Sequence, residues 1–351
     1  MKKPSGRTSL LVVGVIVLVG AAIGVAASRR RRRRTVVHTK GAAPHELLTE
    51  PAAEAETIEI TAGDGAKLHV RAYGDPDAPP LVFSHGWTCS AAYWTPQINA
   101  FADDYRVVVY DQRGHGDSDA GSRKLGADVL ADDLAAVLDA TVPAGRRAVL
   151  AGHSMGGMSI IAWAEKYPEQ VNEKVAGVLL ASTGTDSLVA HSAVIPLPQR
   201  FPRVPVPVAR PLMGATVPLA PSRVTTRALR YIALSPSATT EEVAFCEKIV
   251  LGCPPRTRGG WGAALSAIDI REGLANLTVP TTVLVGTADR LTPPVHAHRL
   301  AAGLEDAGNL ERLVVLEGVG HMSSVEAIDR VNDELRHLLE GADAPAHSKA
   351  G

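Results

Sequence analysis

Cysteine is scarce in this sequence, which holds only three among 351 residues, and neither a CxxC nor an HExxH pattern occurs. Cys246 and Cys253 are seven residues apart, so on one continuous helix their Cα atoms would lie roughly 10 Å apart, beyond the ~7 Å that a disulfide bridges. The sequence therefore predicts no disulfide framework. All three, Cys89 included, are expected to be packed or free thiols. Without a ligand pattern, we expect no metal and no cofactor.

Acidic residues are missing from the first 40 positions, although the whole chain has a net charge of only −1. Those 40 positions hold ten of the 36 Lys and Arg side chains. The remaining 26 bases face all 37 Asp and Glu, which gives the rest of the chain a net charge of −11. Phosphate binding needs a basic surface, so this acidic body argues against nucleic acid as a partner.

One long hydrophobic run stands near the N-terminus, at 10–27, after a short tail at 1–9. As a helix it would be about 27 Å long, just enough to cross a hydrocarbon core. Six arginines follow at 29–34, and such a block favours retention on the cytoplasmic side. We therefore expect a single-pass membrane anchor, then a basic flank and linker at 28–56, with the body on the cytoplasmic side. The alternative is export with a cleaved signal peptide, because small residues at 25–27 resemble a cleavage site.

Short apolar runs bounded by turn residues recur along the body of the chain. They lack polar alternation, which is typical of strands covered on both faces in a parallel sheet. A hairpin is predicted at 57–74, with Gly63-Asp64-Gly65 as its turn. Six further strands are predicted within 79–86, 106–114, 148–154, 175–183, 281–289 and 312–321.

Amphipathic helical patterns alternate with these runs. They lie at 127–140, 155–167, 294–307 and 324–340. The alternation predicts an α/β fold with a doubly wound, mostly parallel, eight-stranded sheet that begins with an antiparallel hairpin.

The alternation breaks at 184–275, which holds no clear strand and a stretch dense in proline. Helical patterns follow near 223–235 and 239–251. We interpret the block as an inserted helical cap. It divides the core into two parts, at 57–183 and 276–340, and leaves a tail at 341–351 that is expected to be disordered.

Three polar residues directly follow predicted strands, at the sheet edge where ligands bind in parallel sheets. They are Ser154, Asp289 and His321, in that order along the chain. A serine hydroxyl is a poor nucleophile at neutral pH, so an imidazole must take its proton during attack. A carboxylate would hold the other ring nitrogen and fix its tautomer. The pattern predicts a catalytic triad; the plainer alternative is that the serine fills a turn and the other two cap structure.

The residues around Ser154 are small, in the sequence GHSMGG. Gly152 and Gly156 would let the chain turn sharply and the following helix approach the strand, as in a nucleophile elbow. Attack on a carbonyl creates an oxyanion, which the backbone N–H of Met155 at the helix start is placed to bind. The second donor is expected from the loop after LVFSHG, at the backbone N–H of Trp87.

The chain resembles α/β-hydrolase fold enzymes from about residue 57 to 340. The motifs are SHGW (84–87), YDQRGHGDSD (110–119), GHSMGG (152–157), GTADRLTPP (286–294) and GVGHMSSVE (318–326). The elbow is similar to that of serine esterases and lipases, and the region from SHGW to GDSD is also similar to cofactor-free haloperoxidases and perhydrolases. By this resemblance, Asp111 and Arg113 belong to an ion-paired structural turn.

The resemblance implies a serine hydrolase that cleaves a carboxylic ester through an acyl-serine intermediate. The expected anchor adds the interpretation that its small-molecule ester substrate is lipid-like. Two alternatives stay open. The same triad could serve a perhydrolase, a haloperoxidase-type enzyme or an acyltransferase, or the fold could be a non-catalytic, membrane-tethered binding protein. The sequence does not decide the acyl group, the alcohol or the oligomeric state.

Overall fold

The computed structural model describes residues 46–192, 194, 213–216 and 218–343. Its strands are β1 Glu56–Thr61, β2 Lys67–Tyr73, β3 Pro80–Ser84, β4 Arg106–Tyr110, β5 Ala148–His153, β6 Val175–Ala181, β7 Thr281–Gly286 and β8 Leu310–Leu316. They form one eight-stranded sheet in the order β1-β2-β4-β3-β5-β6-β7-β8. β2 pairs antiparallel with β1 and β4, and all other neighbours are parallel. The predicted fold class and the hairpin are confirmed.

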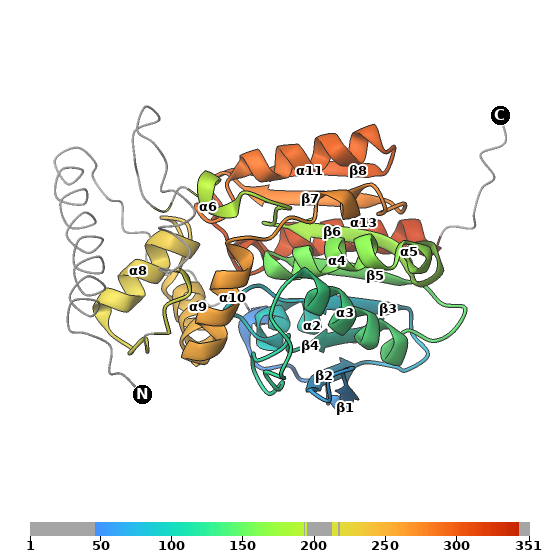
Figure 1. Cartoon of the computed structure of the whole chain (residues 1–351), viewed down its shortest axis with the longest axis horizontal. Coiled ribbons are helices and arrows are strands. Elements are labelled where there is room, and N and C mark those ends of the chain that lie inside the picture. Colours follow the sequence, from blue (N-terminus) through green and yellow to red (C-terminus); the bar gives the residue numbers. More distant parts are fainter. Residues whose placement is uncertain (1–45, 193, 195–212, 217, 344–351) are drawn as a thin grey trace.

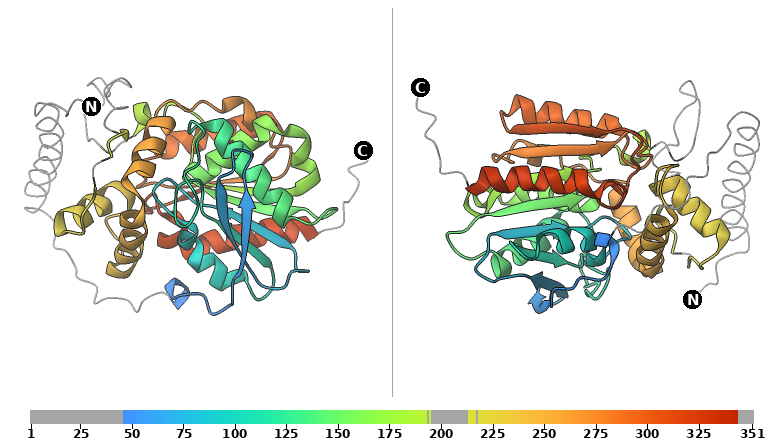
Figure 2. Two further views of the ribbon diagram at one scale, coloured as in Figure 1. Left: turned by 60° about the horizontal axis from the view of Figure 1, so that its bottom comes forward. Right: turned by 180° about the vertical axis from the view of Figure 1, so that it is seen from behind.

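Helices cover both faces of the sheet, which explains the unbroken apolar strands. Every residue of β3, β5 and β7 is buried. One face packs against α3 Ala127–Thr141, α4 Met155–Lys166 and α11 Pro294–Asp306, and the other against α2 Thr95–Phe101 and α13 Ile328–Asp343. Figure 1 shows the first set in front of the sheet, and the reverse view in Figure 2 brings α13 forward.

The register of the central strands brings their carboxyl ends to one level. Ser84 of β3 pairs with Gly152 of β5, and Gly152 pairs with Leu180 of β6. On the other side, Gly286 of β7 pairs with Leu316 of β8. The loops after these strands therefore open at the same edge, where a parallel sheet binds ligands.

The inserted helices lie between β6 and β7 in sequence. They are α6 Leu188–His191, α8 Arg223–Ala233, α9 Thr240–Gly252 and α10 Pro255–Leu265, with the 3₁₀ turn η3 Arg271–Leu274 after them. Figure 1 shows α8, α9 and α10 beyond one end of the strands. The remaining elements are α5 Pro168–Lys174, α12 Ser323–Glu326, η1 Glu46–Leu48 and η2 Ala91–Trp94.

The sequence patterns predicted α8 and α9 but not α10, whose eleven residues include three glycines. Glycine disfavours helix by about 1 kcal/mol relative to alanine. Close packing explains two of the three. A Cβ at Gly259 would lie 2.7 Å from the carbonyl oxygen of Gly214, and one at Gly262 would lie 2.9 Å from the Trp87 ring. Tertiary contacts therefore override the helix propensity here.

Two other boundaries differ from the prediction. The helix expected at 324–340 is divided into α12 and α13, because Ala327 leaves the helical conformation with φ −143° and ψ 50°. α13 also runs to Asp343, so the first three residues of the predicted tail at 341–351 are helical and the others lie outside the described residues.

The predicted membrane anchor requires a correction. Within the residues that the structure describes, no helix has both the length and the apolar character needed to span a bilayer. The predicted segment at 10–27 lies outside those residues, as do the tail at 1–9 and most of the linker at 28–56. The predictions of membrane anchoring and membrane localisation are therefore withdrawn, and the lipid-like substrate loses the reason that was given for it.

Candidate active site

Ser154 lies in the turn between β5 and α4, with φ 53° and ψ −116°. A positive φ is unusual for a residue other than glycine and stores strain in the turn. Its N–H donates to the Ala181 carbonyl at 2.9 Å, and its own carbonyl accepts the Thr183 hydroxyl at 2.6 Å. The glycines on either side permit this geometry. A Cβ at Gly156 would collide with the Ser84 carbonyl oxygen, and one at Gly152 would lie 2.5 Å from the Gly157 nitrogen.

Asp289 and His321 lie on the loops after β7 and β8, and the structure brings them into direct contact. His321 Nδ1 lies 2.9 Å from Asp289 Oδ2. Both are almost fully buried, at 5 % exposure for the histidine and 3 % for the aspartate. A carboxylate that accepts from Nδ1 leaves Nε2 as the free base, which is the tautomer that proton transfer from a serine requires.

The Asp289 carboxylate has a full set of donors. The backbone N–H groups of Leu291 and Thr292 both donate to Oδ1 at 2.9 Å. The Thr292 hydroxyl lies 2.9 Å from Oδ2, the oxygen that faces His321. The loop after β7 therefore holds the carboxylate turned toward the imidazole.

His153, the residue before the nucleophile candidate, connects the elbow to the histidine loop. Its Nε2 donates to the His321 carbonyl at 2.9 Å, and the two ring centroids are 4.8 Å apart. Its other face stacks on Tyr93, with centroids 4.4 Å apart. Burial holds the pKa of His153 well below its ordinary value, so it stays neutral. Its place beside Ser154 in the sequence indicates a residue of the elbow, but nothing in the sequence shows that it contacts the His321 loop.

Among the described residues, no hydrogen bond joins Ser154 Oγ to His321. The neighbouring contact between His153 and His321 nevertheless brings the imidazole to the elbow. Catalytic hydrogen bonds are often long in unliganded enzymes and shorten when substrate binds. The three residues predicted as a triad thus lie at one sheet edge, two of them in contact.

The loop after β3, residues 85–89, is fixed by two buried neutral histidines. His85 Nε2 accepts the Gln112 N–H at 2.9 Å, and its Nδ1 donates to the Gly86 carbonyl at 2.8 Å. His115 Nε2 accepts the Thr88 N–H at 3.3 Å. Burial lowers the pKa of His85 to about 4 and that of His115 to about 3. Both rings therefore remain acceptors at neutral pH and hold the loop in place.

Trp87 and Met155, the predicted oxyanion donors, lie on this loop and at the first position of α4. In the described part of the chain, neither backbone N–H donates to another group. Free N–H groups at a helix start can bind a negative oxygen. The Trp87 side chain points elsewhere, since its Nε1 donates to the Arg258 carbonyl of α10 at 3.0 Å.

The predicted ion-paired turn is built differently from its expected form. Arg113 is fully buried and pairs with Asp133 at 2.7 Å and Asp64 at 2.8 Å. Asp111 instead accepts the backbone N–H groups of Ala91 at 2.7 Å and Asp117 at 3.1 Å. Arg113 and Asp111 therefore hold loops in place, and they are not among the residues predicted as the triad.

One group in the described residues has donor atoms close enough for a metal ion, namely His69, Asp111 and Asp117. Both oxygens of Asp111 already accept backbone N–H groups, and the Asp117 side chain is 80 % exposed. We assign no metal to it.

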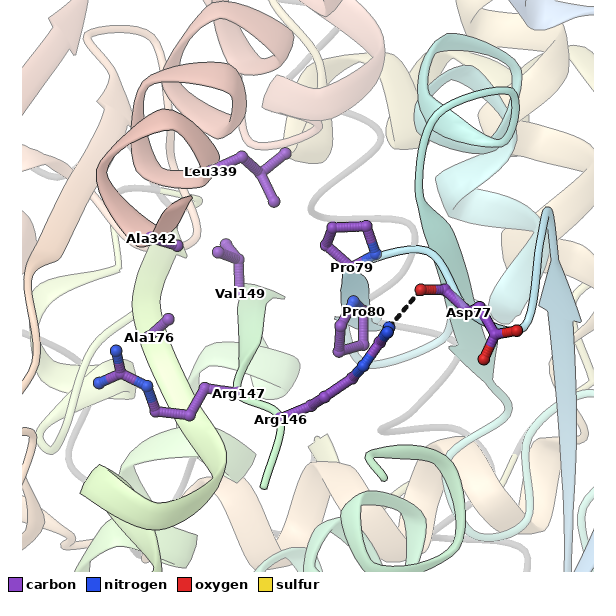
Figure 3. A pocket seen from close by; sticks show the side chains of 9 residues that line it. All are labelled: Asp77, Pro79, Pro80, Arg146, Arg147, Val149, Ala176, Leu339 and Ala342. Carbon is purple, nitrogen blue, oxygen red and sulfur yellow. Dashed lines mark hydrogen bonds between the residues drawn. The ribbon is translucent and has the colours of Figure 1, made fainter. Parts of the chain in front are cut away.

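A cavity of about 260 Å³ lies at the opposite end of the sheet (Figure 3). Pro80, Val149 and Ala176 line it from the N-terminal ends of β3, β5 and β6, and Arg146 and Arg147 line it as well. Ligands of parallel sheets bind at the carboxyl ends of the strands. This cavity is therefore separate from the candidate site.

Comparison with known proteins identifies the family. A family model described as the alpha/beta hydrolase fold matches residues 79–327. The chain belongs to the alpha/beta hydrolase family. It is an enzyme of this superfamily, so the alternative of a non-catalytic binding protein is set aside.

Its relatives include lactonases, haloperoxidases and esterases. The chain is 26 % identical to 3-oxoadipate enol-lactonase 2 of Acinetobacter baylyi, over 80 % of this chain and 96 % of that protein. It is 29 % identical to a non-heme chloroperoxidase of Burkholderia pyrrocinia, over 80 % and 99 %. The crystal structure of an esterase from Rhodococcus sp. ECU1013 superimposes with a TM-score of 0.63 at 26 % identity, over 81 % of this chain and 98 % of that one.

Proposed function

We propose that the protein is a serine hydrolase that cleaves a small-molecule carboxylic ester through an acyl-serine intermediate. The observation that carries the proposal is the contact between His321 and Asp289 beside a strained Ser154. The names of the relatives support an ester or lactone as the bond that is cleaved.

In the proposed first step, Ser154 Oγ attacks the ester carbonyl while His321 Nε2 takes its proton. Asp289 stabilises the imidazolium that forms. The N–H groups of Met155 and Trp87 bind the oxyanion, and His321 returns its proton to the departing alkoxide. Water then attacks the acyl-serine by the same route and releases the acid.

Turnover of p-nitrophenyl esters of different chain lengths tests this proposal. The wild type should release p-nitrophenol, and Ser154→Ala should lower kcat by at least about 10³-fold, because it removes the nucleophile. Ser122→Ala is the control, since this serine is exposed on the loop after β4 and, among the described residues, bonds through its backbone N–H to Asp64 Oδ2. Equal rates for wild type and Ser154→Ala would contradict the proposal.

Perhydrolysis is the second candidate, because the chain aligns over 80 % of its length with a non-heme chloroperoxidase. Hydrogen peroxide would replace water in the second step, and the acyl-serine would give a peracid. Product analysis with ester and peroxide together decides between them: peracid in excess of the uncatalysed amount supports the second candidate, and carboxylic acid alone excludes it.

A further inference from the structure

Thr292 lies where the acid and histidine loops meet, and the proposed mechanism gives it no part. It lies in the loop after β7, two residues before α11 begins, and is 4 % exposed. Its Oγ1 lies 2.9 Å from Asp289 Oδ2 and 3.2 Å from His321 Nδ1. A third neighbour, the Ser182 carbonyl oxygen, lies at 2.8 Å. One hydroxyl thus touches both partners of the carboxylate–imidazole pair.

The hydroxyl has one proton for two acceptors, Asp289 Oδ2 and the Ser182 carbonyl. An ionised carboxylate is the stronger acceptor. When Thr292 donates to it, Oδ2 receives two hydrogen bonds, from this hydroxyl and from His321 Nδ1. Oδ1 also receives two, both from backbone N–H groups.

The Ser182 carbonyl is the competing acceptor for the Thr292 proton. Ser182 directly follows β6 and has φ 49°, a conformation uncommon outside glycine. Its N–H donates to the Leu284 carbonyl of β7 at 2.8 Å. The sheet edge therefore fixes this carbonyl, and the Thr292 hydroxyl can turn its proton either to it or to Asp289 Oδ2.

We propose that Thr292 is a positioning residue for the Asp289–His321 pair, an inference that rests on the proposed function. Its hydroxyl prevents the carboxylate from rotating away from Nδ1. It also shares Oδ2 with the imidazole, which moderates the bond between Oδ2 and Nδ1–H. The residue touches no substrate and acts through Asp289.

Three variants test the role by steady-state kinetics. Thr292→Val keeps the shape and removes the hydroxyl, and should lower kcat about tenfold, the effect of losing one hydrogen bond to a charged group. KM should stay within about twofold, because ground-state binding is unchanged. Thr292→Ser should recover most of kcat. Thr287→Val, whose hydroxyl only accepts the Gly318 N–H, should match the wild type.

A proton NMR measurement adds a readout that needs no turnover. The His321 Nδ1 proton should move downfield in Thr292→Val, because its acceptor loses a competing donor, and return in Thr292→Ser. A valine variant with the kcat and the resonance of the wild type would overturn the inference while the ester hydrolase proposal stands. If the wild type neither hydrolyses esters nor reacts with a fluorophosphonate, the proposed function fails. In that case the NMR measurement alone tests the contact between Thr292 and Asp289. An unchanged His321 Nδ1 proton resonance in Thr292→Val would then overturn the inference.

Discussion

The loops that follow the strands and the helices inserted between β6 and β7 differ in how firmly they are held. Asp289 and His321 lie on loops after buried strands and are at most 5 % exposed. Helix α8 is more open, and its Val224 is 65 % exposed. The sheet thus places the groups proposed for the chemistry, while the inserted helices lie beyond one end of its strands (Figure 1).

The two regions are joined by backbone hydrogen bonds next to His321. The N–H groups of His321 and Met322 donate to the Ala233 carbonyl at the end of α8, at 2.9 and 3.2 Å. The Ser235 N–H donates to Glu326 Oε2 at 2.7 Å. Because the groups proposed for the chemistry lie on the sheet side, changes there should have larger effects on rate than changes at these connections.

The largest effect is expected at the histidine itself. His321→Ala should lower kcat by about 10³-fold or more, because the serine loses its base. His298→Ala is the control, since that histidine is exposed on α11 and should keep the wild-type rate. Measurement is by ester hydrolysis, and a variant with a tenth of the wild-type kcat would show that His321 is not the base.

The next effect is on stability and concerns the buried arginine of the turn after β4. Arg113→Met leaves the Asp133 carboxylate buried without its partner, which should lower the free energy of unfolding by roughly 3–5 kcal/mol. Arg123→Met, which breaks the more exposed pair with Asp132, should cost less than about 1 kcal/mol. Urea unfolding measures the free energy of unfolding of both variants. An equal loss in the two would contradict the expected difference between the buried and the more exposed ion pair.

Acidification should weaken the same region. The folded pKa values of His85 and His115 are lowered by burial to about 4 and about 3, so below pH 6.5 the unfolded chain binds more protons than the folded one. Their contribution is complete above pH 6.5 and is lost as the pH falls toward 4. Unfolding free energy should drop by about 2 kcal/mol for each between pH 7 and pH 5. An unfolding free energy that does not change between pH 7 and pH 5 would contradict the interpretation that both histidines are neutral in the folded protein.

The smallest effect is expected at the connection between the regions. Glu326→Ala removes the acceptor of the Ser235 N–H and should lower kcat about threefold to tenfold through a loosened His321 loop. Burial raises the pKa of this carboxyl, in agreement with its enclosed position. Glu317→Gln, exposed on the preceding loop, is the control. A fall as large as that of His321→Ala would mean that the inserted helices control the chemistry as well.

The sequence predicted the sheet well, because each buried parallel strand is a short apolar run between turn residues. It also predicted that Asp289 and His321 would share one edge, since the carboxyl ends of parallel strands meet there. α10 was not predicted because glycine disfavours helix, whereas two of its glycines are needed for close packing against Trp87 and Gly214. The contacts of Thr292 and His153 were not predicted for another reason. Both reach residues on other loops, and no spacing in the sequence shows which loops meet.

The most direct test of the account is to trap the acyl-serine or its mimic. A fluorophosphonate probe is incubated with the wild type and with Ser154→Ala, and the labelled residue is located by mass spectrometry of proteolytic peptides. The account predicts one adduct, on the peptide of Ser154, and none in the variant. An adduct on another residue, or an unlabelled wild type that still hydrolyses esters, would contradict it.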